Sequence, residues 1–214
     1  MMRYKSGFRT LLSGRGLSKA LCLLFFLALM AGCAGVKGPT GAGYFKSLDR
    51  WSRGQKVYQG FESRLYVNAT CKTMDFRKAY VERYSASYGL SPEHASALME
   101  REAEQAEAYN EFFFSAYTPD GSLNDFDEKG SVWQIYLEDA AGNRARPISI
   151  SKVEGSEPVI REFFPYFDLW SKAYLVRFPK FADSGSEIDP EKAGVKLIVT
   201  GVMGKGELEW LPAQ

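Results

Sequence analysis

Short runs in which apolar and polar residues alternate recur through the second half of the chain. The alternation is regular in residues 132–138 and 172–178, and two further runs, 195–200 and 207–211, flank the glycine-rich segment GVMGKG. Successive side chains of a β-strand point to opposite faces of its sheet, so a period of two predicts strands with one buried face. Glycine-containing turns such as AAGN at 140–143 are typical of hairpins. The chain is therefore constrained to antiparallel β-sheet over much of its length.

One segment, residues 73–108, interrupts this β pattern with a helical one. Thr73 and the pair Ser91-Pro92 are typical helix starts, and Gly89 is typical of a helix end. The segment therefore predicts two consecutive helices. A long alternating run at 57–69 comes before it and predicts the first strand.

These elements together predict a mainly β fold over residues 44–214. We expect a single domain that is an antiparallel two-sheet β-sandwich of about seven strands, with a two-helix insertion at 73–108 after the first strand. A partly open β-barrel is the alternative, since the order of the strands cannot be read from these patterns.

The first 32 residues have a different character. Five basic residues and no acidic one lie in residues 1–19, an uncharged apolar run follows at Ala20–Met30, and the small residues Ala31 and Gly32 come next. These are the three parts of a secretory signal peptide. As a helix the eleven-residue apolar run reaches about 16 Å, too short for the ~30 Å hydrocarbon core of a membrane. A transmembrane anchor is therefore the poorer interpretation.

The run Leu29-Met30-Ala31-Gly32-Cys33 resembles the lipobox of bacterial lipoproteins, in which small residues precede the cysteine that receives the lipid. Met30 stands where that family prefers leucine. The resemblance implies that residues 1–32 are removed and that Cys33 becomes the N-terminus, carrying a diacylglyceryl thioether and an N-linked acyl chain such as palmitate. Two or more acyl chains hold a protein stably on a membrane.

The residue after the cysteine adds a destination to this resemblance. Ala34, in place of aspartate, implies the outer membrane, with the body on its inner leaflet and facing the periplasm. The lipidated Cys33 and the glycine-rich residues up to 43 then form a flexible tether. The membrane, reached through this lipid anchor, is the first predicted partner.

Charge and composition exclude several classes of function for the body. Five of the 27 basic residues and none of the 26 acidic residues lie in residues 1–32, so the rest carries 22 basic and 26 acidic residues, a net charge of −4. An acidic body argues against nucleic-acid binding. Cys71 and His94 are the only cysteine and histidine after Cys33, which excludes a disulfide within the body and sites built from two imidazoles. We expect no cofactor.

Three groups of residues are candidates for binding. Aromatic residues at every fourth position predict a stripe on one helix face that is either a ligand groove for a glycan or an apolar molecule, or simply core: Phe76, Tyr80, Tyr84 and Tyr88. A dense aromatic segment between strands is a candidate partner surface if it is exposed: Phe163, Phe164, Tyr166, Phe167 and Trp170. An acidic loop is a candidate calcium site, although its spacing is not that of an EF-hand: Asp120, Asn124, Asp125, Asp127 and Glu128.

The leading hypothesis from the sequence is a lipid-anchored envelope protein whose body is not an enzyme and acts by binding, as an accessory or structural subunit of an envelope protein complex. The first alternative is a periplasm-facing carrier or sensor of an apolar or glycan ligand. The second is an envelope hydrolase that uses carboxylates such as Asp125 and Asp127, which no spacing argument pairs.

Overall fold

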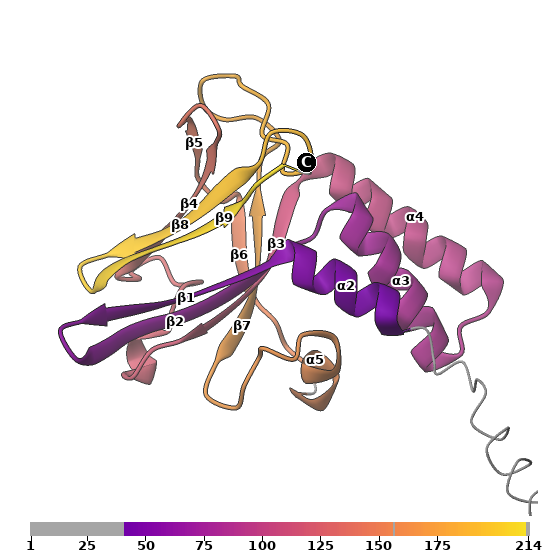
Figure 1. The fold of residues 1–214 in the computed structure, drawn as a ribbon, viewed down its shortest axis with the longest axis horizontal. Coiled ribbons are helices and arrows are strands. Elements are labelled where there is room, and N and C mark those ends of the chain that lie inside the picture. The colour runs from indigo at the N-terminus through magenta and orange to yellow at the C-terminus, as the bar shows by residue number, and fades with distance from the viewer. Residues whose placement is uncertain (1–40, 156, 213–214) are drawn as a thin grey trace, which may run out of the picture. The chain divides into compact units, whose positions relative to one another are not determined.

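A computed structural model describes residues 41–155 and 157–212 and shows two antiparallel β-sheets (Figure 1). The first sheet has five strands, which lie in the order β1 (Ser52–Gln59), β2 (Glu62–Cys71), β3 (Asn110–Tyr117), β7 (Lys172–Phe178) and β6 (Ser149–Lys152). The second has four, in the order β5 (Arg144–Ala145), β4 (Trp133–Asp139), β8 (Val195–Gly201) and β9 (Gly204–Trp210).

Helices cover part of the outer face of the five-stranded sheet. They are α2 (Gly41–Trp51), α3 (Met74–Tyr88), α4 (Pro92–Ala108) and α5 (Glu157–Phe163), with a short 3-10 turn at η1 (Gly121–Leu123). The first three lie side by side in Figure 1, at one end of the β1–β2 hairpin. No helix of residues 41–155 and 157–212 is long and apolar enough to cross a membrane.

The core between the two sheets follows from the alternation in the sequence. Inward-facing residues of β2, such as Leu65 and Val67, meet those of β4 and β8, such as Leu137 and Leu197, and all four are almost fully buried. Burying one such side chain contributes about 1.5–3 kcal/mol, so this layer is the main source of stability. The rings of Phe112 in β3 and Trp210 in β9 lie 5.2 Å apart and link the two sheets.

Strand β3 is buried on both faces, which explains why the three consecutive residues Phe112, Phe113 and Phe114 are all apolar. Its other face lies under the helices, where the ring of Phe113 stacks on that of Phe164 with 3.7 Å between centroids and an interplanar angle of 3°. Tyr44 of α2 and Phe76 of α3 are buried in the same layer. The helices therefore add a second hydrophobic layer to the sandwich.

The edges of the two sheets meet along β1 and β9. The guanidinium of Arg53 in β1 donates from Nε to the carbonyl of Glu209 in β9 at 2.8 Å, and the amide of Glu207 donates to the side chain of Gln55. Side chains of one edge strand thereby satisfy backbone groups of the other, which limits further strand pairing there.

The predicted helical pair and several hairpins are confirmed. Thr73 and Ser91 cap α3 and α4 by accepting from the amides of Phe76 and His94, and Gly89 ends α3 in the left-handed conformation at φ 59°. Gly142 also has positive φ, at 87°, in the turn between β4 and β5. Local capping and turn chemistry thus explains why these boundaries were predictable.

Two features of the predicted fold are wrong. There are nine strands rather than about seven. The alternating run at 57–69 belongs to two strands, β1 and β2, joined by a tight turn at Gly60-Phe61, and the two-residue β5 pairs with β4 after the turn at 140–143. Gly60 takes φ 62°, which lets the chain reverse, and the pairing of β1 with β2 contains a β-bulge at Val57-Tyr58 shortly before this turn. The helices are also not one insertion, since α2 and α5 lie outside residues 73–108. Helix α2 begins at Gly41, within the expected tether.

Candidate functional site

The aromatic stripe of α3 divides between the core and a groove. Phe76 is fully buried, Tyr80 and Tyr84 are half-buried, and Tyr88 is 49% exposed. Tyr80 and Tyr84 line an open groove of about 730 Å³ between α3 and α4, together with polar side chains of α4 that include Arg101 and Gln105. Burial raises the pKa of Tyr80 to about 12, so its hydroxyl stays protonated and can act as a hydrogen-bond donor.

The candidate partner segment is mostly core. Phe163, Phe164 and Phe167 are at most 7% exposed and pack under the helical layer, so they offer no surface to a partner. Tyr166 is half-buried and shares a 2.5 Å hydroxyl hydrogen bond with Thr70 of β2. Trp170 is different, because its side chain is 77% exposed.

A turn fixes the backbone around Trp170. The carboxylate Oδ1 of Asp168 accepts hydrogen bonds from the amide of Trp170 at 3.0 Å and from the amide and hydroxyl of Ser171 at 2.9 and 2.8 Å. Leu169, inside this turn, is 61% exposed. Two large apolar side chains are thus presented to solvent from a locally ordered loop.

Several polar side chains of the acidic loop already form hydrogen bonds with neighbouring protein groups. Asp120 caps η1 by accepting from the amide of Ser122 at 2.9 Å, and Asp125 accepts from the hydroxyl of Ser131 at 2.8 Å. Asn124 is buried and donates to the carbonyl of Ala116 at 2.7 Å, while Asp127 and Glu128 are exposed. Among the residues the structure describes, no group of three or more Asp, Glu, His or Cys lies close enough to hold a metal ion.

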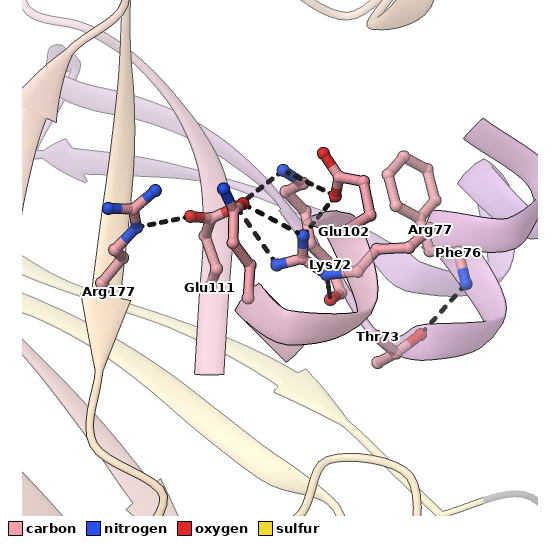
Figure 2. Close-up of polar contacts among 8 residues, drawn as sticks. Lys72, Thr73, Phe76, Arg77, Glu102, Glu111 and Arg177 are labelled. Carbon is pink, nitrogen blue, oxygen red and sulfur yellow. Dashed lines mark hydrogen bonds and ion pairs between the residues drawn. The ribbon is translucent and has the colours of Figure 1, made fainter. Parts of the chain in front are cut away.

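The densest polar arrangement is one that the sequence analysis missed. A buried ion cluster joins the helices to the sheet (Figure 2) and consists of Lys72, Arg77, Glu102, Glu111 and Arg177. The side chain of Arg77 is completely buried and that of Glu111 is 1% exposed. Only Arg177, at 34%, has substantial access to solvent.

Glu111 of β3 is the centre of the buried ion cluster. Its Oε1 accepts from Lys72 Nζ at 2.6 Å and from Arg77 Nη2 at 3.2 Å, and its Oε2 accepts from Arg177 Nε at 2.6 Å. Arg77 also pairs with Glu102 of α4 and donates from Nε to the carbonyl of Lys72 at 2.8 Å. The cluster therefore ties α3, α4, β3 and β7 together through charge-assisted hydrogen bonds.

The electrostatics of Glu111 reflect these partners. Burial by itself would raise its pKa, but the adjacent Lys72, Arg177 and Arg77 outweigh burial and lower the pKa to about 2. Glu111 is therefore ionised at any physiological pH, with both oxygens occupied as acceptors. A carboxylate held in this way is suited to fixing the position of the helices and unsuited to proton transfer.

The lowered pKa of Glu111 predicts a loss of stability in acid. A group with a depressed folded pKa stabilises the protein above its unfolded value, near 4.5, and this contribution disappears as the pH falls toward about 2. The shift corresponds to about 3 kcal/mol. We measure the free energy of unfolding in urea between pH 6 and pH 2 for the wild type and for Glu111→Gln. This free energy should fall more steeply with falling pH in the wild type. Glu107 is exposed, so Glu107→Gln should show the same steep fall in the free energy of unfolding as the wild type. Equal dependence of this free energy on pH in the wild type and in Glu111→Gln would contradict the lowered pKa of Glu111.

A small cavity lies beside the buried ion cluster. It has a volume of about 100 Å³, enough for a few water molecules, and Lys72, Glu111, Lys180 and Asp189 are among its lining residues. Lys180 donates to the side-chain oxygen of Asn110 at 3.2 Å, and partial burial lowers the pKa of its amine.

The cysteine and histidine of the body lie in unlike environments. Cys71 is 2% exposed, and burial raises the pKa of its thiol, so the thiolate that a nucleophile needs is scarce. His94 is exposed in the first turn of α4, where its Nδ1 lies 3.2 Å from the hydroxyl of Ser91.

The signal for the buried ion cluster was present in the sequence as a single residue. Glu111 stands directly before the apolar run Phe112–Phe114 of a predicted strand, and a carboxylate that is buried at such a position requires cations beside it. Its partners could not be named, because residues 72, 77, 102 and 177 are brought together only by the fold. Cys33, the predicted lipid attachment site, lies outside the described residues.

Comparison with known proteins adds no functional argument. No family model matches the chain, and no curated protein matches it. Among solved structures, the chain is similar to a crystal structure of a novel protein of unknown function from Burkholderia pseudomallei, with 11% identity over 78% of this chain and 80% of that chain. The TM-score is 0.38.

Proposed function

We propose that the chain is a lipid-anchored protein of the bacterial cell envelope whose body acts by binding, as an accessory or structural subunit of an envelope complex. The observation that carries this proposal is the N-terminal run of basic segment, short apolar core and Ala31-Gly32-Cys33, which has the form of a lipoprotein signal. Its place is the inner leaflet of the outer membrane, facing the periplasm.

The exposed pair Leu169 and Trp170 supports a binding role for the body. Tryptophan is enriched among the residues that dominate interface energies, particularly where it fills a pocket in the partner. The Asp168 turn reduces the loop entropy that a partner would otherwise have to overcome on binding. We take Trp170 as the anchor of the partner surface, in place of the larger aromatic segment.

A carrier or sensor of a small ligand is the second candidate. The groove between α3 and α4 favours it, because Tyr80 and Tyr84 supply aromatic surface while Arg101 and Gln105 supply polar groups. The groove lies between the two helices rather than between the helices and the sheet, so a ligand there would be partly open to solvent.

Crosslinking in intact Gram-negative cells tests the binding role. We expect the wild type to capture one envelope protein in near-stoichiometric amount, and Trp170→Ala to lose most of it, since removing a tryptophan anchor weakens binding by about 2 kcal/mol or more. Phe181→Ala is the matched control, because Phe181 is also large, apolar and 57% exposed. Equal capture by Trp170→Ala would remove Trp170 as the anchor, and capture of lipid or glycan alone would favour the carrier.

A further inference from the structure

The groove between α3 and α4 has two chemically different ends. The two helices are antiparallel and lie side by side (Figure 1), so one end of the groove is next to their connecting turn and the other is next to the buried ion cluster. Leu90 and Leu98 line the part toward the turn, and Tyr80, Arg101 and Gln105 line the part toward the cluster. From residue 94 to residue 105 of α4 the groove extends about 16 Å.

The end beside the buried ion cluster holds two hydrogen-bond donors without partners. The hydroxyl of Tyr80 and the guanidinium of Arg101 form no hydrogen bond or ion pair with another residue of 41–155 and 157–212. Burial raises the pKa of the Tyr80 hydroxyl, and the charge of Arg101 acts against this rise, so the two groups lie within electrostatic reach of each other. Both are donors that one anion could satisfy.

The carboxylates of this region are occupied or lie elsewhere. Glu102 is the only acidic side chain among the described residues that line the groove, and it is already bound by Arg77 and Lys72. The other acidic residues of α4 are exposed on a different face of the helix and do not line the groove: Glu93, Glu100, Glu104 and Glu107. The groove therefore carries the uncompensated positive charge of Arg101, although residues 33–214 have a net charge of −4.

The end toward the turn is apolar and partly open to solvent. Leu90 and Leu98 are half-buried, Ala97 is exposed, and the half-buried ring of Tyr84 lines the same part of the groove. Sites for small molecules typically combine such apolar surface with a few polar groups that orient the ligand. The volume of the groove, about 730 Å³, is also in the range of such sites.

We propose that this groove binds an amphiphilic carboxylate, a single apolar chain that ends in one negative charge. The inference rests on the second candidate function, a carrier or sensor, and names its ligand class. The carboxylate pairs with the guanidinium of Arg101 and accepts from the hydroxyl of Tyr80, while the chain lies along Tyr84, Leu98 and Leu90. A planar carboxylate matches the parallel N–H groups of a guanidinium. One free cation suits one negative charge, which disfavours a doubly charged phosphate.

Calorimetric titration of the full-length Cys33→Ser chain with decanoate, in buffer without detergent, tests this site. We expect saturable binding of one decanoate per chain, and affinity about tenfold or more lower for Arg101→Gln, because a charge-assisted hydrogen bond is lost. Decylammonium has the same chain and the opposite charge, and it should bind about tenfold or more weakly than decanoate even though the protein is acidic. Acetate, the head group alone, should not displace decanoate.

Arg146→Gln is the matched control. Arg146 is also exposed, lies 5.9 Å from the centre of a tyrosine ring, that of Tyr136, and forms no ion pair in the described part of the chain. This variant should bind decanoate as the wild type does, and thermal unfolding establishes that each variant is folded. The proposal is overturned if the folded wild type binds no decanoate, if Arg101→Gln binds it equally, if decylammonium binds as well, or if acetate displaces it.

The titration separates this inference from the proposed lipid anchor. The Cys33→Ser chain cannot be lipidated, so its affinity for decanoate does not depend on where the protein lies in cells. Loss of decanoate binding would therefore refute the site in the groove, and only the location of the wild type would refute the anchor.

Discussion

Replacing Arg77 with alanine should lower the free energy of unfolding by about 3–5 kcal/mol, the usual cost of removing one partner from a buried ion pair. Arg77 is fully buried, pairs with Glu102 and donates to Glu111 at 3.2 Å and to the backbone carbonyl of Lys72 at 2.8 Å. Its removal leaves Glu102 and Glu111 in the interior with fewer compensating charges. Urea unfolding monitored by tryptophan fluorescence and by circular dichroism measures the change.

Two further variants separate this cause from a general disturbance of α3. Lys78→Ala changes the next, exposed residue and should alter stability by no more than about 0.5 kcal/mol. The double variant Arg77→Met with Glu102→Gln removes a cation and a carboxylate together, and should recover part of the loss because less charge is left unpaired. If Arg77→Ala cost no more than Lys78→Ala, the buried ion cluster would not be what fixes the helices to the sheet.

Replacing Cys33 with serine should remove the lipid anchor. Almost all of the protein should then be found in the soluble fraction or as an unprocessed precursor, and almost none as lipidated protein in the membrane fraction. Serine lacks the thiol that forms the thioether, so no acyl chain can be attached, whereas two or more chains hold a protein stably on a bilayer. Fractionation of Gram-negative cells that express the wild type or Cys33→Ser measures this directly. Growth with a labelled fatty acid should mark only the wild type.

Cys22→Ser is the matched control for this experiment. Cys22 lies in the same apolar segment but in the part that we expect to be removed, so its replacement should leave both fractionation and labelling unchanged. If labelling persisted in Cys33→Ser and vanished in Cys22→Ser, the lipid would be attached to Cys22, and the predicted cleavage before Cys33 would be contradicted. If both variants kept the label, neither thiol alone would be the site of lipid attachment.

The parts of the fold that were predictable have local causes. The boundaries of α3 and α4 follow from Thr73, Gly89 and Ser91, whose capping chemistry is contained within a few residues. Strands β4 and β7 follow from alternation alone, and the structure places both within one residue of the predicted runs. The turn at Gly60 was missed for an equally local reason, because alternation continues on both sides of it.

The candidate sites are built from residues that are far apart in the sequence, and no local pattern shows that these residues meet. Glu111 signals a buried charge, but Lys72, Arg77 and Arg177 meet it only when β3 lies between β2 and β7. Tyr66 of β2 lies beside Tyr117 of β3 only in the observed register, in which the two residues pair. Aromatic content likewise could not separate Phe163, which is buried, from Trp170, which is exposed.

The mass of the N-terminal peptide of the protein recovered from the membrane fraction shows whether the chain is lipid-anchored. We expect the peptide to begin at Cys33 and to carry a diacylglyceryl group and an N-linked acyl chain, with residues 1–32 absent. A peptide that begins elsewhere, or an unmodified Cys33 in membrane-bound protein, would contradict the claim that this chain is a lipid-anchored envelope protein.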